Sequence, residues 1–364
     1  MLKQIGGPTG NTISARWHTG ALTVKTEEKK PTAMNPMPNL LRRAALPAVA
    51  SLLLAAAAAD TTGNLQKTFT VTPGGTLVIE ADRGAIDVTT GGDSQVTVQV
   101  DRKVTRASET KATELLASHT VTFQQDGNRV TVKAKLPAAS TARWFGPNLQ
   151  VHYQVVVPKN FNLDLQTAGG SVAVADLTGQ VKARTAGGSI KTGRTEGTVN
   201  VTTAGGSITI AAATGAIEAR TAGGSIHVGE AGGPLLAETS GGSIHTTKTM
   251  GKARLSTAGG SIEAFEIHAP IEATTSGGSI TASLAGAPEG DCRFETSAGS
   301  VTLSVPASLS ANVDARTSAG RVIADLPVTV QGEAKHSQLE GKLGSGGKLI
   351  KLRTSAGNIH LKSL

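Results

Sequence analysis

The short phrase Thr185-Ala186-Gly187-Gly188-Ser189-Ile190 returns along the middle of the chain and indicates its architecture. Its copies each begin at a threonine and follow one another at intervals of 18 residues: Thr167, Thr185, Thr203, Thr221, Thr239, Thr257 and Thr275. A fixed short period without insertions is typical of a solenoid, in which each coil buries its apolar side by stacking on its neighbours.

Each repeat divides into two halves, since a glycine returns every nine residues from Gly170 to Gly278 and only Ala269 interrupts the series. Two positions after each member lies an apolar residue, such as Val181 or Ile190. Alternation with period two, rich in β-branched residues, predicts short half-buried strands. The chain is therefore predicted to be all-β: a single-stranded β-solenoid with 18-residue coils, each made of two nine-residue strand-turn halves.

The alternation also assigns the two faces of each strand. Before the phrase at Thr185, Val181 and Ala183 are expected to point inward with the threonine, and Lys182 and Arg184 outward. The threonines then form a buried or half-buried hydroxyl ladder, and the phrase serines form an outward ladder beside the turn. At about 4.8 Å per coil, the regular coils make a rod on the order of 30 Å long, too thin to hold a ligand inside.

An export signal is expected at 34–59, with Arg42 and Arg43 before the uncharged run Ala44 to Ala59. An uncleaved membrane anchor is the alternative, although the run is shorter than the ~20 apolar residues that span a bilayer. We expect translation to begin at Met34 and residues 1–33 to be no part of the fold. The predicted location is the periplasm, the cell surface or outside the cell.

Charge does not indicate a nucleic-acid partner. Residues 1–59 hold seven of the 35 basic residues and two of the 27 acidic ones, so their removal lowers the net charge from +8 to +3. Cys292 is the single cysteine and is expected to be an inert buried thiol.

Three regions are predicted after the signal: a β-rich N-terminal cap at 60–166, the regular solenoid at 167–288, and a wider-coil C-terminal end and cap at 289–364. In the N-terminal cap we expect one short helix at Glu109–Ala117 and a turn at Asp126-Gly127-Asn128. The strands expected there and at the entry to the repeats are Leu77–Ala81, Val96–Val104, Thr120–Gln125, Val130–Lys135, Val151–Val157 and Asn162–Gln166.

The phrase changes to T-S-A-G near the C-terminus. It begins at Thr296, Thr317 and Thr354, with spacings of 21 and 37 residues. These spacings predict wider coils, and a closing strand is expected at Ile350–Leu361.

No catalytic, cofactor or metal motif is found. A calcium-binding nonapeptide solenoid needs an aspartate in each turn, where this chain has Gly-Gly-Ser. His227 and His245 are one coil apart and should be neighbours, but without a third ligand at matching spacing we interpret them as exposed histidines rather than a metal site.

Trp144 and Phe145 form the only adjacent aromatic pair. They are a possible ligand-contact loop, although a plug at the end of the solenoid core is the favoured interpretation.

The segments Val156 to Leu163 and Gly344 to Gly347, and the closing Ile350 to Ile359, together with the serial T-x-x-G-x-[IV] coils, resemble the bacterial putative-adhesin family of β-strand-repeat proteins, a domain of unknown function. The resemblance covers 60–364. It implies a fold and offers no catalytic residues.

The predicted function is an exported, non-enzymatic β-solenoid that acts as an adhesin-like binding or structural module at the cell envelope. Its partner would be an envelope, matrix or carbohydrate ligand, with transient membrane contact only through the signal peptide and no cofactor. One alternative is a carbohydrate-active β-helix enzyme, a lyase or hydrolase, which would need a loop-built acidic cleft. Another is a self-assembling envelope scaffold, which would need a terminus without a cap.

Overall fold

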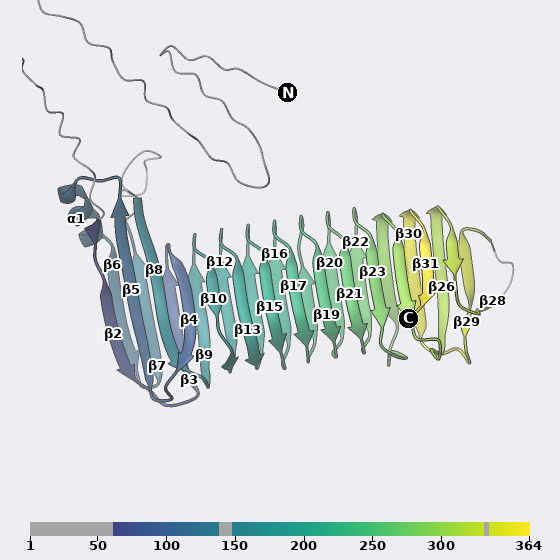
Figure 1. Cartoon of the computed structure of the whole chain (residues 1–364), viewed down its shortest axis with the longest axis horizontal. Coiled ribbons are helices and arrows are strands. Elements are labelled where there is room, and N and C mark those ends of the chain that lie inside the picture. Colours follow the sequence, from purple (N-terminus) through teal and green to yellow (C-terminus); the bar gives the residue numbers. More distant parts are fainter. Residues whose placement is uncertain (1–60, 138–147, 331–334) are drawn as a thin grey trace, which may run out of the picture. The chain divides into compact units, whose positions relative to one another are not determined.

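The computed structural model describes residues 61–137, 148–330 and 335–364, all within one compact unit, Ala56–Leu364. The predicted extension 1–33, the predicted signal 34–59, and Trp144 and Phe145 lie outside the described residues. The described part is all-β apart from one helix, α1 (Glu109–Ser118), and its strands form two long, mostly parallel sheets (Figure 1). This confirms an all-β, solenoid-like fold.

We call the two sheets A and B. In spatial order, sheet A contains β1 (Thr61–Thr62), β5 (Gln95–Thr105), β8 (Asn148–Pro158), β4 (Ala85–Gly91), β10 (Val172–Val174), β13 (Ile190–Glu196), β15 (Ile208–Ala213), β17 (Ile226–Ala231), β19 (Ile244–Thr249), β21 (Ile262–Ile267), β23 (Ile280–Leu284), β25 (Val301–Val305), β31 (Ile359–Ser363) and β27 (Val322–Ala324). Two further strands pair beside this path, β2 (Leu65–Thr70) with β5 and β11 (Leu177–Thr178) with β13.

Sheet B contains, in spatial order, β28 (Thr329–Val330), β29 (Gln338–Leu343), β26 (Ala311–Ala319), β30 (Leu349–Ala356), β24 (Cys292–Ala298), β22 (Ile271–Thr275), β20 (Ala253–Thr257), β18 (Leu235–Glu238), β16 (Ile217–Thr221), β14 (Val199–Thr203), β12 (Val181–Thr185), β9 (Phe161–Thr167), β3 (Gly75–Ala81), β7 (Arg129–Lys135) and β6 (Thr120–Asp126).

In the middle of the stack each coil gives one strand to each sheet. Strand β12 pairs in parallel with β14, with Val181 opposite Val199 and Thr185 opposite Thr203. The faces agree with the predicted alternation, since Val181, Ala183 and Thr185 are buried while Lys182 is half-buried and Arg184 exposed. Inward side chains of the two sheets meet in one continuous core between them.

The phrase threonines are buried, but their hydroxyls do not bond to one another as a ladder. The Thr221 hydroxyl donates to the carbonyl of Gly206 in the preceding coil at 2.8 Å and accepts the N–H of Gly224 in its own turn at 3.3 Å. Each hydroxyl thus links two coils at a backbone turn, which satisfies polar groups that packing would otherwise bury unpaired. The serines do form a ladder, in which Ser225 N–H donates to the Ser207 Oγ at 3.3 Å.

The N-terminal end contains the predicted helix and the hairpin of β6 and β7. The first coil, β3 and β4, does not lie outermost. Strand β3 lies between β7 and β9, and β4 lies between β8 and β10. Antiparallel strands β1, β2 and β5 cover the edge of sheet A, and β6 covers that of sheet B.

At the C-terminal end, too, the terminal coil of the sequence does not lie outermost. The prediction of a single closing strand at Ile350–Leu361 was wrong, because this segment forms two strands. The chain turns at Gly357, giving β30 to sheet B and β31 to sheet A. A side chain there would collide with the Gly299 carbonyl, since a Cβ atom would lie 2.2 Å from its oxygen. Strand β30 lies between β24 and β26, and β31 between β25 and β27. The last coil of the sequence is therefore inserted beneath the one before it.

Candidate functional site

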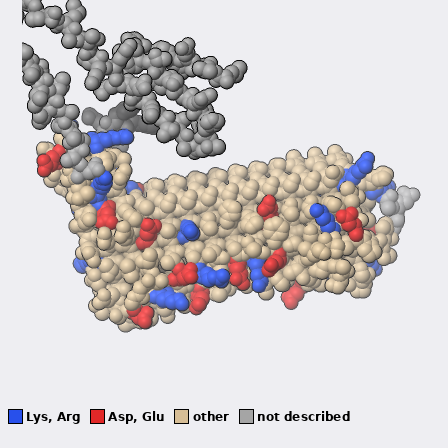
Figure 2. All heavy atoms as spheres, in the orientation of Figure 1, with Lys and Arg blue, Asp and Glu red and all other residues tan. Residues whose placement is uncertain are grey.

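Charged side chains of opposite sign alternate along one face of the stack (Figure 2). On the outward side of sheet B they pair across neighbouring strands, as in Lys182 with Asp164 at 3.4 Å and Arg254 with Glu272 at 3.5 Å. Exposed pairs of this kind contribute little to stability. They do neutralise one another.

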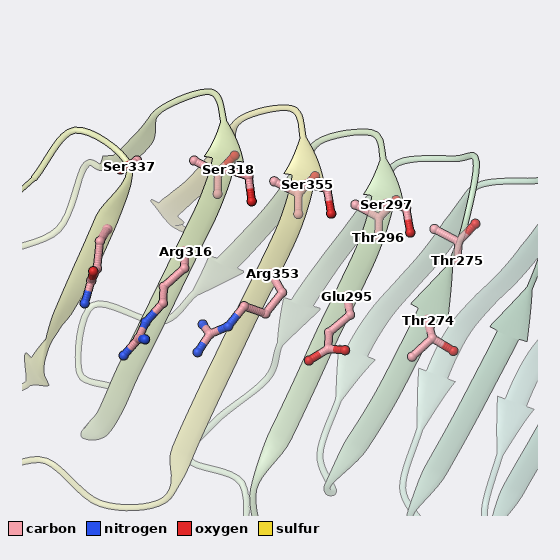
Figure 3. A pocket seen from close by; sticks show the side chains of 13 residues that line it. Thr274, Thr275, Glu295, Thr296, Ser297, Arg316, Ser318, Ser337, Arg353 and Ser355 are labelled. Carbon is pink, nitrogen blue, oxygen red and sulfur yellow. The ribbon is translucent and has the colours of Figure 1, made fainter.

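A groove of about 600 Å³ opens on sheet B near its C-terminal end. A row of outward side chains crosses it, with Thr274 on β22, Glu295 on β24, Arg353 on β30 and Arg316 on β26 (Figure 3). Hydroxyl groups border it on the turn side, from Ser297, Ser355, Ser318 and Ser337. Two guanidinium groups on adjacent strands thus lie beneath a row of hydroxyls.

Both guanidinium groups donate to one carboxylate, Asp314 on β26, and Arg316 also donates to Glu340 on β29 at 3.2 Å. Arg316 donates to Asp314 from Nε at 2.8 Å, and Arg353 donates to its other oxygen. Arg353 also donates to the Asp314 carbonyl at 2.7 Å, which fixes its orientation. Partial burial by itself raises the pKa of Asp314, but hydrogen bonds and charge from Arg353 and then Arg316 outweigh it and hold that pKa below its ordinary value. Asp314 therefore stays ionised and fixes the two cations.

Glu295 is the acidic member of the row. Its Oε2 accepts a hydrogen bond from the Arg293 guanidinium at 2.5 Å, and its Oε1 lies 3.4 Å from the Lys351 Nζ. Burial favours its neutral form, but Arg293 and Lys351 together keep its pKa below the ordinary value. A carboxylate, two fixed guanidinium groups and several hydroxyls give the groove both acceptors and donors, as a ligand with hydroxyls and a negative charge requires.

The groove residues were not predicted from the sequence. Arg316 and Arg353 lie opposite each other in register, and Arg353 lies opposite Glu295, although their spacings in the sequence are unequal. The available signal was the serine after each late threonine, because T-S-A-G adds a hydroxyl where most earlier coils have alanine. Pairing of those phrases out of chain order could not be deduced from their spacing.

The residues singled out from the sequence fall elsewhere. Trp144 and Phe145 lie outside the described residues, and Cys292 is buried, with burial raising the pKa of its thiol. His227 and His245 are neighbours, with ring centroids 5.9 Å apart. A third polar residue at matching spacing was overlooked, since Glu263 Oε2 lies 3.0 Å from His245 Nδ1.

Among the described residues, no three His, Cys, Asp or Glu side chains are grouped closely enough to hold a metal ion. Within 61–137, 148–330 and 335–364, no helix has the length and apolar character needed for a membrane crossing.

The sequence profile of the Toastrack DUF4097 family matches residues 75–362. The chain therefore belongs to this family, a domain of unknown function, which agrees with the resemblance seen in its repeats and closing segment. No curated protein matches the chain.

Solved structures resemble the chain at low identity. A putative adhesin from Parabacteroides distasonis has 10% identity and a TM-score of 0.36, covering 83% of this chain and 97% of its own. A putative adhesin from Bacteroides fragilis has 12% identity and a TM-score of 0.30, with the same two coverages, 83% and 97%. A putative lipid binding protein from P. distasonis has 12% identity and a TM-score of 0.36, covering 81% and 96%. At these values, the likeness does not assign a function.

Proposed function

We propose that this protein is an exported, non-enzymatic adhesin-like module that binds an acidic polysaccharide of the cell envelope or matrix in the groove of sheet B. The observation that carries the proposal is the pair Arg316 and Arg353, fixed side by side by Asp314 below a row of serine hydroxyls. Planar guanidinium groups bind carboxylate or sulfate oxygens through paired hydrogen bonds, and hydroxyls bind sugar hydroxyls.

In this proposal the 18-residue coils serve as a stiff spacer, and the non-periodic ends at 60–166 and 289–364 serve as caps. Export rests on the signal-like segment 34–59. Secretion is tested by cell fractionation of the full chain and of a version with Leu52, Leu53 and Leu54 replaced by Asp, which should remain in the cytoplasm.

Binding is tested with the purified chain on three immobilised polysaccharides: polygalacturonate, which is carboxylated, heparin, which is sulfated, and neutral dextran. We expect binding to one or both acidic polymers, and a loss of about tenfold or more in affinity for Arg316→Gln, because a charge-assisted hydrogen bond is removed. Arg254→Gln is the matched control, since Arg254 is also a paired arginine on the outer side of sheet B but lies outside the groove.

Equal loss in both variants, or binding to dextran as strong as to the acidic polymers, would contradict the groove proposal. The same incubations are assayed for new reducing ends and for unsaturated products. Release of either product would favour the alternative, a carbohydrate-active lyase or hydrolase.

A further inference from the structure

A second cluster lies on the outward side of sheet A, on the other sheet from the groove. We call His227 on β17, His245 on β19 and Phe265 on β21 the aromatic row. The ring centroids of His227 and His245 are 5.9 Å apart, and those of His245 and Phe265 are 5.7 Å apart with an edge-on arrangement. Three rings on successive coils therefore form one continuous strip.

The strip is accessible and has polar groups along it. His227 is exposed, and His245 and Phe265 are half-buried. Glu263 lies opposite His245 in register and holds its Nδ1 at 3.0 Å, which leaves Nε2 for another partner. Thr209 precedes His227 in the same column. The aromatic row thus offers the nitrogens of its two imidazoles and lies beside a carboxylate and a hydroxyl.

The backbone is irregular directly after Phe265. Strand β21 is in register with β19 along its whole length, whereas β23 has one residue fewer, so that the register between β21 and β23 shifts between Ala264 and Ile267. Glu266, within this bulge, has a φ of 43°, a left-handed conformation that non-glycine residues seldom adopt. The Glu266 N–H donates to the Ser283 hydroxyl at 3.2 Å. Residues with strained backbone angles cluster at functional sites.

From this geometry we infer that the aromatic row binds a pyranose ring of a glycan. A pyranose has a face of C–H groups, which packs on an aromatic ring, and an edge of hydroxyls, which needs both donors and acceptors. The strip offers the phenyl ring of Phe265 for the face, and Glu263 with the free imidazole nitrogens for the edge. Sites for such ligands combine aromatic surface with a few placed polar groups.

This site does not depend on the groove of sheet B. The sugar that the aromatic row binds need not be charged, whereas the proposed ligand of the groove carries an anionic group. Loss of one site by mutation therefore leaves the other available, and the two proposals can fail separately.

The test uses the full chain with 13C-labelled histidine and unlabelled neutral oligosaccharides of glucose, galactose and N-acetylglucosamine. We expect at least one sugar to shift the ring signals of His227 and His245, assigned from His227→Ala and His245→Ala. Phe265→Ala should weaken binding about tenfold, the loss of one stacked ring, while Phe265→Tyr should retain it. His268→Ala is the control, because His268 is exposed on the same coil but outside the row.

Three results would overturn the inference: no shift with any sugar, binding that Phe265→Ala leaves unchanged, or equal loss in His268→Ala. Unchanged thermal unfolding of Phe265→Ala separates loss of the site from loss of the fold. Zinc chloride is added alone in a parallel titration. If zinc shifts the two histidines and no sugar does, the row is a metal-binding pair and the pyranose assignment is wrong.

Discussion

Two adjacent glycines of each phrase have different structural roles. A Cβ atom on Gly224 would lie 2.1 Å from the carbonyl oxygen of Gly206 in the preceding coil, whereas the nearest atom to a Cβ on Gly223 is the Gly205 oxygen at 3.4 Å. Coils can therefore stack at strand spacing only because the second glycine has no side chain. The first glycine is not restricted by contact.

We predict that Gly224→Ala destabilises the protein by about 2 kcal/mol or more, because the coils must separate to accept the methyl group. Gly223→Ala should be neutral or slightly stabilising, since it restricts the unfolded chain without a clash. Urea unfolding followed by circular dichroism measures both. Equal effects of the two substitutions would contradict the stacking argument.

His119, at the end of α1, is 2% exposed, and neither of its ring nitrogens has a hydrogen-bond partner among the described residues. Burial lowers its pKa below the ordinary value of 6.5; nearby Asp82 opposes this shift, and Arg102 and Arg83 add to it. The unfolded chain therefore takes up a proton at a higher pH than the folded one. Stability from this residue is present above the ordinary pKa and is lost as the pH falls below it.

We predict that the unfolding free energy of the wild type falls between pH 7 and pH 5, and that His119→Leu shows a smaller fall. His268→Leu, at an exposed position, should keep the wild-type pH dependence. Denaturant titrations at several pH values give the slope of the unfolding free energy against pH for the wild type and both variants. A slope in His119→Leu equal to that of the wild type would assign the acid sensitivity to another group.

Among the elements, β30 has the least expected position, between β24 and β26. Its placement is supported by side-chain bonds as well as by the ladder, since the Thr354 hydroxyl donates to the Gly299 carbonyl and the Thr317 hydroxyl to the Gly357 carbonyl. The threonine bridges thus connect the three late coils in the order 296, 354, 317. That order differs from the order in the sequence.

Engineered cysteines test this order. Arg293 and Lys351 lie opposite each other on β24 and β30, while Asp314 is one strand further away. In a Cys292→Ala background, Arg293→Cys with Lys351→Cys should form a disulfide, because neighbouring strands lie about 4.8 Å apart. Arg293→Cys with Asp314→Cys should not, at about twice that distance. Mass spectrometry after mild oxidation distinguishes the pairs, and the reverse result would place β26 next to β24.

Strict alternation made the regular strands of sheet B predictable, because each residue's face follows from its parity. In sheet A parity fails near the end of strands β13 to β21, where the last buried residue, such as Ile267, lies five positions after the first. The helix and the β6–β7 hairpin were also predictable, since their signals lie within one short segment. The C-terminal order was not, because Thr296, Thr317 and Thr354 begin the same phrase and any of them can pair with any other. The groove is formed by that order, so Arg316 and Arg353 could not be recognised as neighbours.

The two proposed sites lie on different sheets and depend on different features of the stack. The aromatic row is formed within the regular coils by rings at outward positions of three successive strands. The groove exists only where the period is lost. A single thin core supports both, because coils that stack in register fix the outward side chains of successive strands at strand spacing.

The inserted last coil also has a consequence for the order of synthesis. The ribosome makes β26 before β30, yet in the finished protein β30 lies next to β24. Because β26 carries the same T-S-A-G phrase, it can occupy the open edge of β24 while the rest of the chain is still being made. Strand β26 must then leave that edge, or remain unpaired, before β30 pairs with β24. The middle of the stack can form coil by coil as the chain emerges, whereas this end can be completed only after β30 and β31 have emerged.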